Sequence, residues 1–251
     1  MTEGVTVLTV GAFTAGAGWE PFTDWPIWRF LLEGLLVALR IAAMSMALSL
    51  IIGVMAAVGR LARVRIVAWL STTYIEVFRA TPLLLLIFFV FFGSARAGLG
   101  FGPITAAVVA LTLYNSAVVA EIVRAGILSI SRGIIEASRA LGLTYLQSMR
   151  YVALPMALRR MAPGVVSQLI TLFKDTSLAS VIGVLELSRR ARVIYDTPLY
   201  NNPVEVLAVV AMMYFIPSYL LSRLSEYLEM GPERRSGSAA APILAEADPV
   251  G

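Results

Sequence analysis

The sequence predicts an all-α polytopic membrane protein with about five transmembrane helices. Of its 251 residues, 59% are hydrophobic and the mean hydropathy is +0.82, which lies well above the values of ordinary soluble domains. Apolar runs long enough to cross a bilayer recur along the chain. Arginines gather in some connecting segments and are sparse in others, as the positive-inside rule requires.

The first apolar run covers residues 31–57 and can cross a bilayer with some tilt. Arg60, Arg63 and Arg65 follow it directly, which marks this end as cytoplasmic and places the N-terminus outside. Residues 1–28 lack the basic start of a signal peptide. They are expected to form an extracytoplasmic segment, either a soluble tail or an interfacial belt around its tryptophans.

The second apolar run, residues 66–93, is interrupted by Glu76, Arg79, Thr81 and Pro82. Proline lacks an N–H and disfavours helix at the residue before it, so we expect a kink or break near Thr81. Further spans are expected at residues 103–123, 165–184 and 204–221.

The connecting segments define the rest of the topology. Residues 124–163 carry six arginines and a single acid, Glu136, so this loop is expected inside. Basic residues also place the C-terminus inside. The chain therefore divides into the N-terminal segment, a transmembrane domain over residues 29–230 and a disordered cytoplasmic tail over residues 231–251.

The cytoplasmic loop has the pattern of two short helices. Residues 136–141 predict one helix, which Gly142 can end because glycine adopts the left-handed conformation. Thr144 then offers an N-cap and Gln147 completes a capping-box pattern. The second helix is expected to run until Pro155 interrupts it. Two short helices that meet at a glycine outside the membrane predict a docking element.

Lys174 and Asp175 are ionisable residues in the middle of a span, where a charge is costly. Gln168, Thr171 and Asp175 fall on one helix face, and Lys174 lies on its edge. We interpret this polar face as part of a solute pathway. The alternative is a structural ion pair satisfied between helices.

Other polar residues in the spans allow the same two roles. Glu76 and Arg79 are spaced to pair on one helix face, with the break at Thr81 opening backbone groups towards a cavity. Thr112 and Asn115 could join helices or contact a solute. The candidate pathway residues are Glu76, Arg79, Thr81, Asn115, Gln168, Thr171, Lys174 and Asp175.

Three arginines, Arg189, Arg190 and Arg192, lie in a segment expected outside, against the charge bias. They predict a short surface helix that faces either a partner or the pathway entrance, or a cluster near lipid headgroups. Glu121 and Arg124, near the inner end of the third span, are expected to brace the loop.

Cysteine and histidine are absent, which excludes thiolate nucleophiles, histidine bases and the usual zinc and iron–sulfur sites. No Walker A pattern occurs, so ATP binding by that route is excluded. No metal or cofactor is expected. No nucleic-acid partner is expected either, since the basic residues follow the membrane topology.

Several spaced motifs resemble those of ABC importer permeases. Glu136-Ala137, Gly142 and Leu154-Pro155 are similar to the EAA loop of that family. Residues 76–83, EVFRATPL, resemble the EVFRGTPL signature of the polar amino-acid permeases. Residues 111–126 and 173–183 resemble two further blocks, so the similarity runs from about Leu32 to Glu226. Ala80 replaces the usual glycine and Ile134 the usual glutamine, and neither change removes a charge or a helix breaker.

The resemblance implies a type I ABC importer bundle in the bacterial inner membrane, with the loop as coupling helix. It implies a permease subunit, not an enzyme, for amino acids, with Lys174 binding a carboxylate and Asp175 an amino group. The implied partners are a dimer of ATPase subunits, an extracytoplasmic binding protein and a second permease, identical or different. The residues implied to contact the ATPase are Glu136, Ala137, Ala140, Leu141, Gly142 and Pro155.

Two other functional classes remain as alternatives. A self-sufficient secondary amino-acid transporter would show an internal repeat with paired broken helices, whereas the sequence has one interrupted segment. An intramembrane enzyme would need a nucleophile beside Lys174 and Asp175.

Overall fold

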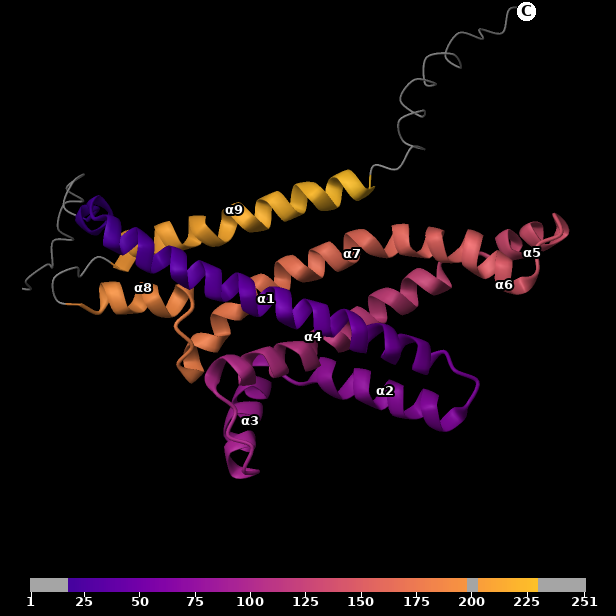
Figure 1. Cartoon of the computed structure of the whole chain (residues 1–251), viewed down its shortest axis with the longest axis horizontal. Helices are drawn as coiled ribbons and strands as arrows, with labels where there is room; N and C mark the ends of the chain where they lie inside the picture. The colour runs from indigo at the N-terminus through magenta and orange to yellow at the C-terminus, as the bar shows by residue number, and fades with distance from the viewer. Residues whose placement is uncertain (1–17, 198–202, 230–251) are drawn as a thin grey trace, which may run out of the picture.

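The computed structural model describes residues 18–197 and 203–229, and this part of the chain is helical without strands. Figure 1 shows long helices running side by side along the longest axis of the molecule. Four helical segments of the described chain are long and apolar enough to cross a membrane, and a fifth crossing is added if α2 and α3 count as one broken span. The predicted all-α membrane fold is thereby confirmed, while the orientation in the membrane stays a prediction.

Helix α1 (Trp25–Arg60) packs along α4 (Pro103–Leu128) through small residues. A methyl group at Gly53 would lie 2.7 Å from Cγ1 of Val119 and 2.8 Å from the carbonyl oxygen of Ser116. Ser49 donates a hydrogen bond of 3.2 Å to the carbonyl oxygen of Thr112. Small residues allow such close backbone approach in membrane helices, so this pair forms the centre of the bundle.

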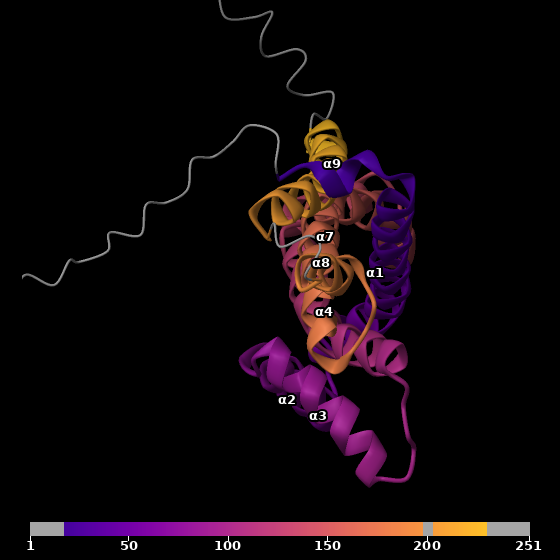
Figure 2. The same cartoon turned by 90° about the vertical axis from the view of Figure 1, so that its left-hand side faces the viewer.

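The predicted break near Thr81 is confirmed. Helix α2 (Arg65–Ala80) ends at Thr81, α3 (Leu83–Arg96) begins after Pro82, and their axes differ by 105°. The Thr81 hydroxyl donates 2.8 Å back to the carbonyl oxygen of Val77. The apolar run over residues 66–93 is thus divided into two helices, and α3 turns sideways out of the bundle (Figures 1 and 2).

The two short loop helices are confirmed. Helix α5 (Arg132–Ala140) is followed by Gly142 with φ of +92°, and α6 (Tyr145–Ser148) begins with a capping box formed by Thr144 and Gln147.

Pro155, however, does not interrupt the second helix. A π-helical turn, η2 (Met149–Ala153), joins α6 to α7 (Leu154–Asp175), and the N–H of Leu154 donates to the carbonyl of Met149. Proline is tolerated here because it lies in the first turn of α7, where its missing N–H costs little. The helix that carries the fourth span thus begins well before residue 165, while the span expected over residues 165–184 stays a prediction.

The chain after α7 continues through a 3₁₀ segment, η3 (Thr176–Ile182), the helix α8 (Leu187–Tyr195) and the last long helix, α9 (Pro203–Glu229). Helix α8 lies at one end of the molecule. The end of α1, the pair α5–α6 and the end of α9 point to the other (Figure 1). The expected tail over residues 231–251 and most of the N-terminal segment lie outside the described residues.

Candidate functional site

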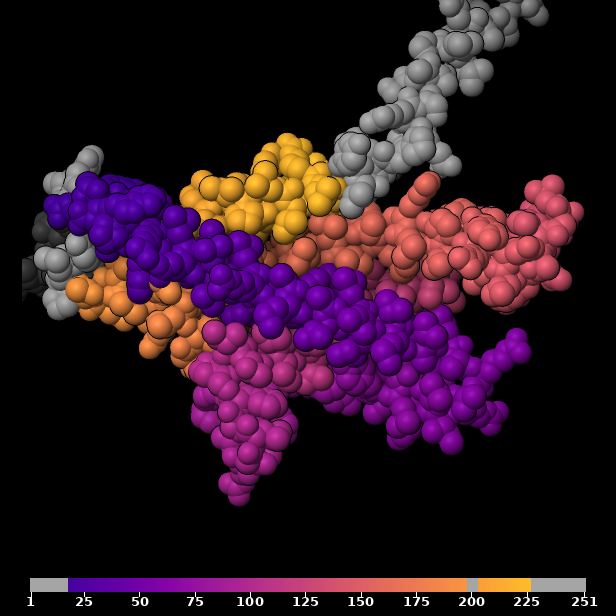
Figure 3. All heavy atoms as spheres, in the orientation of Figure 1, coloured from indigo at the N-terminus to yellow at the C-terminus, as the bar shows by residue number. Residues whose placement is uncertain are grey.

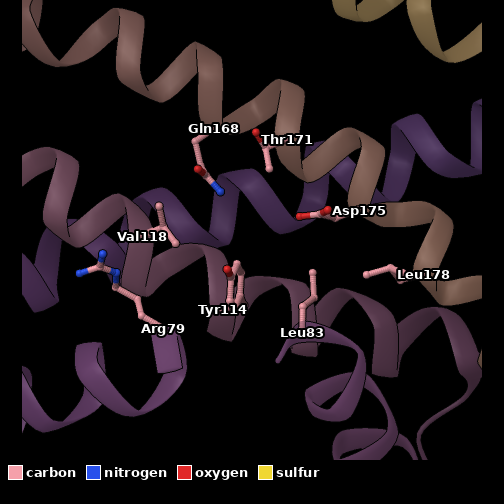
Figure 4. A pocket seen from close by; sticks show the side chains of 8 residues that line it. All are labelled: Arg79, Leu83, Tyr114, Val118, Gln168, Thr171, Asp175 and Leu178. Atoms are coloured by element: carbon pink, nitrogen blue, oxygen red, sulfur yellow. The ribbon is translucent and has the colours of Figure 1, made fainter. Parts of the chain in front are cut away.

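A cavity of about 470 Å³ lies where the α2–α3 break faces α4, α7 and η3 (Figure 4). Its lining combines one cation, one carboxylate, three uncharged polar side chains and three aliphatic ones. The lining residues are Arg79, Leu83, Tyr114, Val118, Gln168, Thr171, Asp175 and Leu178.

The three polar residues from α7 reach the cavity together. Gln168, Thr171 and Asp175 share one helix face by their spacing, and Figure 4 shows them extending towards the side where Tyr114 and Leu83 lie. The polar face expected in this span therefore faces a cavity.

The two charged groups of the lining have no ion pair within the described part of the chain. Asp175 is half-buried and Arg79 is exposed. Figure 4 places Arg79 towards one end of the lining and Asp175 towards the other, near Leu178. Arg79 interacts electrostatically with Glu121, and Asp175 with Lys174, but neither forms a close ion pair. Opposite charges in one cavity lining are a candidate site for a ligand that carries both signs.

The expected pair of Glu76 and Arg79 does not form, because Glu76 contacts Arg60 of α1 at 3.6 Å. Arg60 also pairs with Glu121, which in turn accepts 2.8 Å from Arg124. Both acids form their close ion pairs with other arginines, and Arg79 interacts with Glu121 only at longer range. Glu121 and Arg124 therefore tie α4 to α1, where bracing of the loop was expected.

Asn115 lies beside the cavity and does not line it. It is fully buried, accepts 2.6 Å from the Gln168 amide and donates 2.8 Å to the carbonyl oxygen of Leu111. Thr81 lines a separate apolar groove in the α2–α3 elbow. Lys174 is exposed and does not line the cavity.

Four lining residues were missed by the search for charged and polar pairs: Leu83, Tyr114, Val118 and Leu178. Leu83 directly follows the break at Pro82, so its position was available from the break itself. Tyr114 and Val118 are spaced i, i+4 and mark one face of α4. Nothing in the sequence marks Leu178.

Helix α7 also carries a polar stripe on its exposed surface. Ser167, Thr171 and Lys174 recur at helical spacing, and all three are exposed. They belong to a crossing segment, and an ammonium group facing hydrocarbon is costly. The stripe is therefore a surface for water or for another protein chain.

The α5–α6 pair protrudes from the bundle (Figure 3) and exposes apolar side chains. Leu141 is 86% exposed and Leu146 76% exposed. Gly142 between them faces open space, since a methyl group built on it meets no atom within 4 Å. All six residues implied to contact an ATPase are exposed: Glu136, Ala137, Ala140, Leu141, Gly142 and Pro155.

The three arginines near α8 do not act alike. Arg190 turns inward, where it donates 2.9 Å to the Phe30 carbonyl oxygen and 2.9 Å to Glu33, whereas Arg192 is exposed. Glu186, which was not among the predicted residues, is fully buried and caps α8. Its place just before an apolar helical pattern was the available signal, because acids are favourable near the N-terminus of a helix.

Comparison with known proteins decides the family. Residues 49–231 match the binding-protein-dependent transport system inner membrane component family. The chain belongs to this family. It is 43% identical over 204 residues to the probable glutamine ABC transporter permease of Bacillus subtilis, covering 80% of this chain and 93% of that relative. It is 36% identical over 218 residues to the glutamate/aspartate import permease of Escherichia coli, covering 82% and 96%.

A solved structure agrees with the family assignment. The crystal structure of an amino acid ABC transporter with histidines superposes with a TM-score of 0.74 at 31% identity, covering 82% of this chain and 94% of that chain. This inner membrane component is therefore a multi-pass transport subunit, and membership of the family favours a multi-subunit transporter over a self-sufficient secondary carrier.

Proposed function

We propose that this family member is the permease subunit of an ATP-driven amino-acid importer. The observation that carries the proposal is the cavity with Arg79 and Asp175 unpaired in one lining. An amino acid carries a carboxylate and an ammonium group, so it supplies the partner that each side chain lacks. The ABC amino-acid permeases among its relatives support the same substrate class.

Binding of the zwitterion assigns one role to each charged residue. The Arg79 guanidinium donates to the substrate carboxylate in a planar, two-pronged geometry that lysine does not offer. The Asp175 carboxylate accepts from the ammonium group. Arg79 thus takes the role expected for Lys174, which lies off the lining. Gln168 and Thr171 add hydrogen-bonding groups for the substrate side chain.

A second permease subunit is the partner that the exposed face of α7 requires. Ser167, Thr171 and Lys174 would be poorly solvated in lipid, and another subunit placed against them closes a polar pathway between the two chains. We propose a second copy of this chain or a homologous permease at that surface.

The ATPase subunits dock, in this proposal, on α5–α6. The exposed Leu141 and Leu146 supply apolar contact area outside the bundle. Gly142 supplies a sharp turn with no side chain in the way. The chain lacks a Walker A pattern, so the nucleotide is bound by the partner.

The opposite end of the molecule, around α8, faces the extracytoplasmic binding protein on the predicted orientation. The transport cycle then couples the two ends. ATP closes the ATPase dimer and moves α5–α6, and the continuous helix formed by α6, η2 and α7 transmits this motion to the cavity. The binding protein releases its amino acid while the cavity opens outward, and hydrolysis reopens the inward side.

Reconstitution of the chain with a candidate ATPase subunit tests the proposal. The ATPase rate is measured in proteoliposomes with and without binding protein and a panel of amino acids. Stimulation by one liganded binding protein supports the importer and identifies the substrate. An ATPase that neither binds the chain nor responds under any pairing, together with gradient-driven uptake by the chain alone, would overturn it.

Substitution of Gly142 tests the docking surface. Gly142→Asn tolerates the left-handed conformation but adds a side chain, whereas Gly142→Val adds strain of roughly 1–2 kcal/mol as well. If contact with the ATPase matters, both variants lose the coupling between hydrolysis and uptake. Full coupled uptake by Gly142→Asn would show that only the turn conformation matters.

A further inference from the structure

Helix α8 lies at one end of the bundle, alongside the first part of α1 (Figure 1), and is held there by two neighbouring helices. Viewed from that end, α1 runs beside it and α9 lies above it (Figure 2). Its buried Leu187, Ala191 and Ile194 pack with Leu31 of α1 and with a cluster of apolar residues on α9. The polar contacts of α8 are concentrated at its first turn.

The Glu186 carboxylate is the centre of these polar contacts. It is fully buried and accepts 2.9 Å from the N–H of Ser188, 2.7 Å from the N–H of Arg189 and 2.7 Å from the hydroxyl of Tyr214. All three donors are neutral, and Arg190 pairs with Glu33 instead. The N-terminal end of α8 therefore supplies most of the stabilisation of this carboxylate.

The length of the glutamate side chain gives it a second function. A serine or asparagine cap also satisfies N–H groups at a helix start, but its shorter side chain leaves less reach towards α9. Glu186 caps α8 and binds Tyr214 through the same carboxylate. The residue therefore joins two helices as well as ending one.

The first turn of α8 is also fixed to α1. A methyl group at Gly34 would lie 2.9 Å from the Cα of Leu187 and 2.8 Å from Cδ of Arg190, so the two helices nearly touch there. Arg190 bonds the Phe30 carbonyl oxygen and Glu33, and its guanidinium lies 4.5 Å from the Phe30 ring. Helix α8 thus moves with the outer part of α1.

Tyr214 connects this joint to the cavity wall. Its hydroxyl holds Glu186, while its ring packs against the ring of Phe173 with centroids 5.2 Å apart. Phe173 is buried in α7, two residues before the cavity residue Asp175. One side chain therefore touches both the cap of α8 and the segment of α7 that carries the cavity carboxylate.

We infer that Tyr214 is a positioning residue that passes displacements of α8 to Asp175. The inference rests on the proposed function, since it concerns how a partner docking at α8 regulates the same cavity. When α8 shifts with α1, Glu186 pulls the Tyr214 hydroxyl, and the ring pushes Phe173. The end of α7 then changes its position relative to the cavity.

The absence of cysteine from the sequence gives a direct test. Leu178→Cys places a single thiol on the cavity wall, at a lining residue without a proposed contact to substrate or partner. A membrane-impermeant maleimide measures its accessibility from outside in cells that express the full transporter. Tyr214→Phe removes only the hydroxyl and keeps the ring on Phe173. Tyr219→Phe is the matched control on the same helix, because its hydroxyl accepts only from the exposed Arg223 at 2.9 Å.

The expected result is labelling about tenfold faster in Tyr214→Phe, the population change that accompanies loss of one hydrogen bond to a charged group. Labelling in Tyr219→Phe stays at the parent rate. Addition of liganded binding protein changes the labelling rate of the parent transporter and has little effect on the labelling rate of Tyr214→Phe. Labelling in Tyr214→Phe that is equal to or slower than the control overturns the inference.

Two further measurements separate positioning from simple stability. A lower melting temperature in Tyr214→Phe with unchanged labelling would also overturn the inference. Glu186→Gln is then combined with Tyr214→Phe. The Tyr214 hydroxyl also contacts the side chains of Ser188 and Thr176, so Tyr214→Phe has an effect of its own. The double change should still cost less than the sum of the two single changes, because both disrupt the bond between Glu186 and Tyr214, and strictly additive effects contradict the link. If labelling in Tyr214→Phe is no faster than in the control while uptake is intact, only this inference fails. If the ATPase activity of the parent transporter does not respond to any liganded binding protein, the proposed function fails.

Discussion

The Gln168 amide donates a hydrogen bond of 2.6 Å to the side-chain oxygen of Asn115, joining α7 to α4 beside the cavity. Asn115 is fully buried and Gln168 lies on the cavity lining. Both residues therefore make the interhelical contact, and contact with a solute stays a prediction for Gln168. Asn115 fixes the rotamer of Gln168, and only Gln168 meets the cavity.

Gln168→Leu should destabilise the folded chain by about 1–3 kcal/mol, because it leaves a buried oxygen of Asn115 without a donor. Adding Asn115→Leu should cost less than the sum of the two single changes, since the unsatisfied oxygen is then gone. Thermal unfolding in detergent measures all three variants. Strict additivity would show that the hydrogen bond contributes little.

Gly53→Ala should separate α1 from α4. The new methyl group would lie 2.7 Å from Val119 and 2.8 Å from the Ser116 carbonyl oxygen, and overpacking of this kind costs about 1–3 kcal/mol. Gly93→Ala in α3 is the control, because a methyl group there meets nothing within 4 Å. The melting temperature should fall for Gly53→Ala and stay or rise for Gly93→Ala. Equal effects would contradict close α1–α4 packing.

Much of the architecture was predictable because its determinants are local. The break at Thr81 follows from Pro82, the turn at Gly142 from the freedom of glycine, and the α6 start from the spacing of Thr144 and Gln147. Proline alone could not predict the uninterrupted helix at Pro155, because its effect depends on whether it falls in a first turn.

The site was predictable only in part, because helical spacing gives a face and not its neighbours. The shared face of Gln168, Thr171 and Asp175 followed from their spacing, and all three line the cavity. The ion pair between Glu76 and Arg60 could not be predicted from spacing, since Arg60 lies on another helix. Lys174 is adjacent to Asp175 in sequence, yet the helical rotation between neighbours turns it off the lining.

The stability of the folded chain should depend on pH through Glu186. Burial raises the pKa of this carboxyl above its ordinary value of 4.5, outweighing the hydrogen bonds that favour the charged form. The folded state therefore holds the proton more tightly than the unfolded state. Its contribution to stability is complete below the ordinary pKa and is lost as pH rises through the raised pKa.

Glu186→Gln removes this titration. The melting temperature of the parent chain minus that of Glu186→Gln should therefore fall as the pH rises above the ordinary pKa of 4.5 and through the raised pKa of the folded state. Tyr219→Phe, which leaves Glu186 in place, should follow the parent curve. A difference that is constant or grows with pH would show that the carboxyl is not preferentially protonated in the folded state.

Uptake should depend on Arg79 and Asp175 more than on Lys174. Arg79→Gln and Asp175→Asn each leave one charge of a bound zwitterion without a partner, which should lower uptake at least tenfold, equivalent to about 1.4 kcal/mol. Lys174→Gln keeps a polar side chain off the lining and should retain most of the uptake. Transport in proteoliposomes at several substrate concentrations measures the three. A larger loss for Lys174→Gln would restore the lysine to the carboxylate-binding role.

Cysteine cross-linking should locate the second permease against α7. Lys174→Cys introduces a single thiol on the exposed polar stripe, and Leu48→Cys introduces one on an exposed, apolar part of α1. If two copies meet at the stripe, mild oxidation in membranes gives a disulfide-linked dimer for Lys174→Cys and none for Leu48→Cys, since the bond needs Cα atoms within about 7 Å. If the partner is a different permease, the link appears only when that chain carries a matching cysteine. If Lys174→Cys forms neither a homodimer nor a link to a different permease, while Leu48→Cys does form a dimer, the stripe faces water and the subunit interface lies on α1.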